Sequence, residues 1–268
     1  MLDFAIATAR AAGQVLREGL NSPREIRYKG AIDLVTEMDL AAERIILDAI
    51  RARFPDHAIL SEEAGASEGA TRGGYRWVVD PLDGTTNYAH GLPLFCVSIG
   101  LERDGVPVLG VIYAPVLDEL YAAELGCGAT LNGKPIHVSQ TNDLNRSLLV
   151  TGFPYDVQVK SSNLQHFGSF IHAVQAVRRL GSAAIDLAWV AAGRFDGFWE
   201  PRLAPWDLCA GSVIVSEAGG RVSAYDGGPF SIYGKEVLAS NGLVHEAMIG
   251  VLQGQPAANG TPAAGGTP

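Results

Sequence analysis

Two carboxylates stand at the end of an apolar run in the stretch Trp77–Asn87, which reads Trp-Val-Val-Asp-Pro-Leu-Asp-Gly-Thr-Thr-Asn. The pattern predicts a short buried strand that ends at Asp80 and a helix that begins near Gly84. Asp80, Asp83 and the Leu82 carbonyl oxygen are oxygen ligands of the kind that a hard divalent cation such as Mg²⁺ prefers. Amides at a helix N-terminus suit a phosphate. A metal and a phosphate at one point indicate phosphoryl transfer.

The same residues also permit a simpler interpretation. Asp-Pro and Asp-Gly are common turn dipeptides, and an Asp before a helix is an ordinary cap. The motif alone therefore leaves a turn without catalytic function open. Other acidic residues of the chain must decide between the two interpretations.

Three further carboxylates occupy similar positions, at helix starts or strand ends. Asp39 lies in the first turn of a helix, Glu62 follows the short strand Ala58–Ser61, and Asp207 lies in the first turn of a helix. Each has a local alternative, namely a capping box, a solvated turn and an interaction with the helix dipole, respectively. Their functional alternative is convergence on one cleft, because sites of layered α/β folds lie at the carboxyl ends of strands.

Composition limits the classes of function. The chain has 268 residues, of which 47% are apolar, and a net charge of -9, which argues against a nucleic acid as a direct ligand. Cys96, Cys127 and Cys209 have no C-x-x-C spacing, so we expect neither disulfides nor zinc, and each should be a buried small hydrophobe. No apolar run reaches the roughly 18 residues of a membrane span. A cytoplasmic protein without a signal segment is expected.

Hydrophobic periodicity predicts an outer layer of helices, then a mainly antiparallel sheet, then alternating helix and strand. The first expected elements are a helix at 2–20, a strand pair within 23–35 and a helix at 36–53. The expected sheet strands are 94–101, 106–113, 120–123, 129–131 and 136–138. The later elements are a strand at 147–151, helices at 161–177 and 182–192, a strand at 195–199 with Glu200 at its end, a helix from Pro205 to Gly219, and strands at 220–224 and 237–239. Residues 255–268 are rich in Pro, Gly and Ala and are predicted to be a disordered tail.

Together these acidic residues and their surroundings resemble the inositol monophosphatase family of metal-dependent, lithium-sensitive phosphatases. Asp80–Asn87 looks like the first signature of that family, and Trp206–Gly211 followed by Glu217–Gly220 looks like the second. Three more segments match in order, namely Gly126–Gly133, Gly181–Ala184 and Phe195–Glu200. Several ordered elements make a chance resemblance improbable, and the likeness covers roughly residues 1–250.

The resemblance implies an α/β (α+β) fold, a five-layer α-β-α-β-α sandwich of the sugar phosphatase type, as one domain over residues 1–254. It also implies a homodimer that hydrolyses a small phosphorylated polyol with two or three Mg²⁺ ions per site and that lithium inhibits. Glu62, Asp80 and the Leu82 carbonyl would hold one ion. Asp80, Asp83 and Asp207 would hold another, with Asp80 bridging.

The resemblance assigns the remaining roles in the same way. The residues that would act in catalysis are Asp39, Glu62 and Thr85, with the Thr85 hydroxyl and Asp39 orienting and activating the attacking water. The residues that would bind substrate are Asp83, Gly84, Thr85, Ala183 and Glu200. Clustered carboxylates repel one another, and divalent cations relieve that repulsion. No Cys-x5-Arg motif or His nucleophile is visible, which favours direct attack by water.

The substrate stays open at this level. Glu200 favours a polyol over a nucleotide because a carboxylate accepts hydrogen bonds from hydroxyls. Arg202 stands where many relatives have Gly, and it could contact a second anionic group or be merely exposed. The loop 152–168 matches nothing specific, and the loop between Ser61 and Trp77 could act as a lid.

Three hypotheses follow. The leading one is an inositol-1-monophosphatase. Related phosphatases that act on fructose 1,6-bisphosphate, histidinol phosphate or 3′-phosphoadenosine 5′-phosphate are the alternative within enzymes. A non-enzymatic regulatory binding module is less favoured, because all five carboxylates are present, although a fold does not fix a function.

Overall fold

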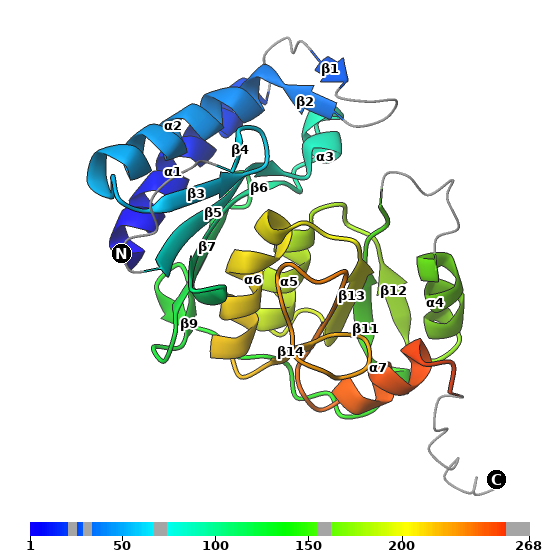
Figure 1. Ribbon diagram of the computed structural model, residues 1–268. Coiled ribbons are helices and arrows are strands. Elements are labelled where there is room, and N and C mark those ends of the chain that lie inside the picture. The colour runs from blue at the N-terminus through cyan, green and yellow to red at the C-terminus, as the bar shows by residue number, and fades with distance from the viewer. Residues whose placement is uncertain (21–25, 29–33, 67–73, 155–161, 256–268) are drawn as a thin grey trace, which may run out of the picture.

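The five predicted layers are present in the computed structural model, which describes residues 1–20, 26–28, 34–66, 74–154 and 162–255 (Figure 1). Helices α1 (Leu2–Gly19) and α2 (Glu37–Arg53) form the first layer, and a large sheet forms the second. Helices α5 (Ala183–Ala191) and α6 (Pro205–Glu217) separate this sheet from a smaller one. Helices α4 (Ser162–Ile171) and α7 (His245–Leu252) form the fifth layer. The predicted fold class is confirmed.

The large sheet has eight strands in the order β10-β9-β8-β7-β6-β5-β3-β4. Its neighbours pair antiparallel except for β3 and β5, which are parallel. The strands are β3 (Ala58–Ser61), β4 (Gly65–Ala66), β5 (Tyr75–Asp83), β6 (Cys96–Arg103), β7 (Val106–Ala114), β8 (Glu119–Glu124), β9 (Ala129–Leu131) and β10 (Lys134–Pro135). A separate antiparallel pair joins β1 (Ile26–Tyr28) to β2 (Leu34–Thr36), within the predicted segment 23–35 and the residue after it.

The smaller sheet has five strands in the order β12-β11-β13-β15-β14. They are β11 (Leu148–Thr151), β12 (Ala176–Arg178), β13 (Gly197–Pro201), β14 (Arg221–Ser223) and β15 (Glu236–Ser240). β11 is parallel to β12 and β13, whereas β15 is antiparallel to β13 and β14. Within the described residues, no helix is long and apolar enough to cross a lipid bilayer.

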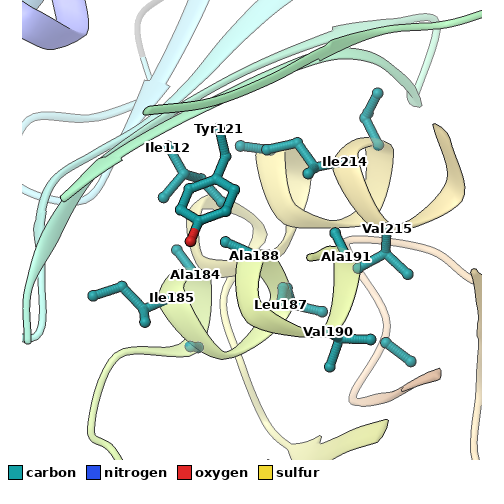
Figure 2. Close-up of a cluster of buried hydrophobic side chains, with 14 of the residues drawn as sticks. Ile112, Tyr121, Ala184, Ile185, Leu187, Ala188, Val190, Ala191, Ile214 and Val215 are labelled. Atoms are coloured by element: carbon teal, nitrogen blue, oxygen red, sulfur yellow. The ribbon is translucent and has the colours of Figure 1, made fainter. Parts of the chain in front are cut away.

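The central core lies between the two sheets, around α5 and α6. Ile112 of β7 and Tyr121 of β8 point from the large sheet towards α5, beside Ile214 of α6 (Figure 2). A helix that is covered on both sides has no polar face to present, and every residue from Leu208 to Val215 in α6 is buried. The buried part of α6 packs against the large sheet, and the Ser98 hydroxyl of β6 donates a hydrogen bond of 3.3 Å to the Trp206 carbonyl oxygen, which helps to position Asp207.

The largest difference from the prediction concerns the end of β5. The strand does not end at Asp80 but continues to Asp83, with a shift of pairing register against β6 between these residues. The Asp80 Oδ1 atom accepts a hydrogen bond of 2.9 Å from the Leu82 amide, and Pro81 has no amide hydrogen to give to the ladder. This bulge places both carboxylates at the same edge of the sheet.

Other boundaries differ where tertiary pairing overrides the local pattern. The helix expected at 161–177 ends at Ile171, and residues 176–178 form β12 because they pair with β11. The strand expected at 136–138 is instead β10, which pairs directly after the tight turn at Asn132 and Gly133. Glu200 lies inside β13 rather than at its end, because it pairs with Val237.

The remaining differences concern the cysteines, one additional helix and the segments that the structure does not describe. Cys96 and Cys209 are buried as predicted, but Cys127 is exposed because it lies in a loop with glycine on both sides. Helix α7 had no counterpart in the prediction. Residues 256–268 of the predicted tail 255–268, residues 67–73 of the predicted lid and residues 155–161 of the loop 152–168 lie outside the described residues.

Candidate active site

Three of the predicted carboxylates meet where the large sheet abuts the start of α6. Asp80 and Asp83 come from the bulge of β5, and Asp207 comes from the first turn of α6. One carboxylate oxygen of each lies within 4.8 Å of the others. The Asp207 Oδ2 atom also accepts a hydrogen bond of 2.8 Å from the Ala204 amide. Asp207 therefore both caps its helix and joins the cluster, so that its two interpretations are compatible.

The environment of these groups disfavours their charged forms in the metal-free protein. Burial raises the pKa of Asp80 well above its usual value, and the charges of Glu62, Asp83 and Asp207 raise it further. Burial also raises the pKa of Asp207, with the charge of Asp83 next in importance. The pKa of Asp83 is raised by burial, although hydrogen bonds from Ser182 and Ala184 oppose the shift. A divalent cation would remove this repulsion.

Glu62 lies beside Asp80, in the turn after β3. Its amide donates a hydrogen bond of 3.2 Å to the Val79 carbonyl, and its carboxyl group raises the pKa of Asp80 through charge and a hydrogen bond. Glu43 of α2 holds this turn, because its Oε1 atom accepts hydrogen bonds from the Ser61 hydroxyl at 2.5 Å and the Ala64 amide at 2.9 Å. Sequence reasoning missed Glu43, although it stands one helical turn after Asp39 on the same face of α2.

Asp39 and Thr85 form a second polar contact next to the cluster. The Thr85 hydroxyl lies 3.4 Å from Asp39 Oδ1 and 3.0 Å from the Leu82 carbonyl oxygen. Thr85 begins helix α3 (Thr85–Ala89), and Gly84 precedes it with a φ of 93°. A Cβ atom on Gly84 would lie 2.9 Å from the Leu94 carbonyl oxygen, so the position requires glycine.

One cavity of about 260 Å³ is lined by most of the predicted site residues, namely Glu62, Asp80, Leu82, Asp83, Gly84, Thr85 and Asp207. Asp39 and Glu43 are not part of its lining. Ala183 and Glu200 also line this cavity, and so does Arg202, which has an exposed side chain and a φ of 64°. Asp39 is 1% exposed and lies behind Thr85. The structure thus brings the predicted residues together around one space.

Sequence reasoning missed several residues of the cavity wall. Asp186, Arg179 and Gly152 line the cavity together with Glu200. A Cβ atom on Gly152 would lie 2.2 Å from Glu200 Oε2, so glycine is needed beside that carboxylate. Burial raises the pKa of Glu200 to about 8, and the charges of Arg179 and Asp83 lower and raise it, respectively. The G-x-A-A pattern at Gly181–Ala184 pointed to this wall but not to Asp186.

The five-layer sandwich with a carboxylate cluster between its sheets defines a layered α/β protein of the metal-dependent sugar phosphatase class. The chain belongs to the inositol monophosphatase family, whose model matches residues 1–257.

Relatives match this chain over nearly its whole length. It is 49% identical to the inositol-1-monophosphatase of Synechocystis over 257 residues, which cover 95% of this chain and 89% of that protein. The structure of the inositol monophosphatase from Anabaena superposes with a TM-score of 0.86 at 46% identity, covering 96% of each chain. The Nus factor SuhB of Escherichia coli K12 is 42% identical over 252 residues, covering 93% of this chain and 94% of that protein.

Proposed function

We propose that this protein is a Mg²⁺-dependent phosphate monoester hydrolase whose leading substrate is myo-inositol 1-phosphate. The observation that carries the proposal is the meeting of Asp80, Asp83 and Asp207 within 4.8 Å of one another at the wall of a cavity. Similarity to inositol monophosphatases supports the substrate class. A homodimer and a cytoplasmic location are part of the same proposal.

The residues present fit a hard divalent cation. Carboxylate oxygens are the ligands that Mg²⁺ prefers, and the acidic residues near the cluster are buried or half-buried rather than fully exposed. Asp80, Asp83 and Asp207 would hold one ion, and Glu62, Asp80 and the Leu82 carbonyl would hold another. When bound, Mg²⁺ lowers the pKa of a coordinated water and offsets the negative charge of the phosphate and of the leaving oxygen.

The residues of the chain then orient the reactants. The Thr85 hydroxyl would orient the attacking water, and Asp39 Oδ1, at 3.4 Å from that hydroxyl, would accept the proton passed through it. Helix α3 has only five residues, so the individual amides of Gly84 and Thr85, rather than a helix dipole, would bind the phosphate. Asp83, Ala183 and Glu200 would contact the polyol.

The test is phosphate release from myo-inositol 1-phosphate with and without Mg²⁺. We expect activity only with Mg²⁺, inhibition by millimolar lithium, and a loss of about 10³-fold or more in kcat for Asp83→Asn, because the amide removes a charged oxygen ligand. A panel with fructose 1,6-bisphosphate, histidinol phosphate and 3′-phosphoadenosine 5′-phosphate decides between substrates. A bisphosphate is included in this panel because the exposed Arg202, which lines the cavity, could contact a second phosphate group. Absence of Mg²⁺-dependent turnover on every monoester would exclude the proposal.

A regulatory binding role is a second candidate, favoured by the similarity to a protein named Nus factor SuhB. Such a role would use a surface of the fold rather than the carboxylates. A partner that co-purifies equally well with the wild-type protein and with Asp83→Asn would support it. This outcome is compatible with hydrolase activity, since the two roles use different parts of the molecule.

A further inference from the structure

The cavity wall holds one carboxyl group that neither the metal cluster nor the fold uses. Asp186 lies in the first turn of α5, is 1% exposed, and borders the cavity that Glu200 also borders. Within the described part of the chain, its Oδ1 atom has no hydrogen-bond partner. A buried polar atom without a partner is costly, so its retention calls for an explanation outside the folded chain itself.

The helix does not need Asp186 as a cap. Ser182 already fills that place, because its side chain accepts a hydrogen bond from the Ile185 amide at 3.3 Å. Asp186 is also not one of the three carboxylates that approach within 4.8 Å of one another. A capping role and a place in the three-carboxylate cluster are therefore both unsupported.

The neighbours of Asp186 lie on the side of the cavity that we propose binds the polyol. Burial, then the carboxylates of Glu200 and Asp83, raise the pKa of Asp186 well above its usual value, while Arg179 opposes them. Arg179 and Ala183 line the same wall. Asp186 thus belongs to the part of the cavity wall near both Asp83 and Glu200, where the alcohol part of a phosphate ester would lie.

We propose that Asp186 is a further substrate-contacting residue that, together with Glu200, accepts hydrogen bonds from separate hydroxyl groups of the polyol. The inference rests on the proposed function and narrows it to esters whose alcohol carries more than one free hydroxyl. A site with two carboxyl acceptors favours an ester whose hydroxyls pair with both groups over an ester without hydroxyls, which leaves them as they are in the free protein. The preference would come from Asp186 and Glu200, whereas phosphate binding would come from the metal cluster.

The test compares myo-inositol 1-phosphate with p-nitrophenyl phosphate, which has no hydroxyl on its alcohol part. In Asp186→Leu, which has nearly the same shape, kcat/KM for the inositol ester should fall about 10- to 100-fold. The value for the aryl ester should change by less than about threefold, since that ester never used the hydrogen bond. Asp186→Asn keeps one acceptor oxygen, so its kcat/KM for the inositol ester should fall less than that of Asp186→Leu. The melting temperature of Asp186→Leu should equal or exceed that of the wild type, because an unpaired buried polar group is removed.

The matched control is Asp196→Asn. Asp196 is buried away from the cavity and accepts hydrogen bonds from the Ser139 hydroxyl and the Leu148 amide. This variant should melt earlier while the ratio between the two substrates stays the same. If the ratio of kcat/KM for the inositol ester to kcat/KM for the aryl ester is the same in Asp186→Leu as in the wild type, the role of Asp186 is overturned. A wild-type protein that cleaves neither ester would instead overturn the proposed hydrolase function.

Discussion

At the scale of single residues, His245 shows how hydrogen bonds fix a protonation state. Its Nε2 atom lies 2.8 Å from the Ser223 hydroxyl and its Nδ1 atom 2.8 Å from the Ser240 hydroxyl. Ser223 donates its proton to the Ala224 carbonyl, so its oxygen accepts from Nε2–H. Ser240 accepts from the Gly242 amide, so its hydroxyl donates to Nδ1. The neutral imidazole satisfies all of these partners, whereas a protonated ring does not.

This arrangement predicts a pH dependence of stability. Burial, with Arg221 adding to it and Glu246 opposing it, lowers the pKa of His245 from 6.5 to about 4. A lowered pKa means that the unfolded chain binds this proton more readily, so the contribution is fully present above pH 6.5 and is lost as the pH falls towards 4. The free energy of unfolding should fall by up to about 3 kcal/mol through this residue. Urea unfolding of the wild type and His245→Gln between pH 7 and about 4 measures it.

The comparison with the variant isolates the histidine, since other titrating groups are common to both proteins. The stability difference between wild type and His245→Gln should shrink as the pH falls. A constant difference across this range would show that His245 has the same pKa in the folded and the unfolded chain. The expected direction is opposite to that of the acidic cluster, whose raised pKa values stabilise the metal-free protein more at low pH.

The acidic residues of the site were predictable because each carries a local signal. Asp80 and Asp83 follow an apolar run, and Asp207 follows Pro205 at a helix start. Asp186 and His245 carry none, because Asp186 stands within an apolar helix and the partners of His245 are set by the pairing of β14 with β15. Their roles depend on neighbours distant in sequence, which local patterns do not report.

At the scale of elements, the close approach of α6 to the large sheet depends on small residues. A Cβ atom on Gly110 of β7 would lie 2.2 Å from the carbonyl oxygen and 2.7 Å from the Cα atom of Ala210 in α6. These are backbone atoms of a buried helix and cannot move aside as a side chain would. The position of α6, and with it that of Asp207, therefore depends on the absence of a side chain at Gly110.

We expect Gly110→Ala to destabilise the protein by about 3 kcal/mol, near the upper end of overpacking costs, because the helix must shift. The matched control is Gly168→Ala in α4, where a Cβ atom would meet nothing within 4 Å. The free energy of unfolding of Gly168→Ala should rise by about 1 kcal/mol, because alanine has a higher helix propensity than glycine. Denaturant unfolding measures the free energy of unfolding of both variants. Equal changes relative to the wild type would contradict the packing argument.

Element types were predictable where periodicity was strong, as in α1, α2 and the hairpin of β6 and β7. Element types were not predictable where tertiary pairing decides them. Residues 176–178, for example, form a strand because they pair with β11. The bulge that carries β5 past Asp80 belongs to the same group, because it needs β6 as a partner.

At the scale of the whole molecule, the candidate site lies where separate layers meet. Asp80 and Asp83 belong to the large sheet, Asp207 to the central helices and Glu200 to the smaller sheet. A cation held by the first three groups would tie the sheet to the helix layer. Its binding free energy would then add to the stability of the whole fold.

We therefore expect Mg²⁺ to raise the melting temperature of the wild-type protein. At a concentration of about 100 times Kd the linkage is worth about 2.7 kcal/mol, or roughly 5–10 °C for a chain of this size. Asp207→Asn should lose most of this shift, because a charged ligand is gone. Its metal-free form should melt no lower than the metal-free wild type, since the amide oxygen still accepts from Ala204 and the repulsion among the carboxylates is reduced. Unfolding of Asp207→Asn without metal would show that capping of α6 is the main task of this residue.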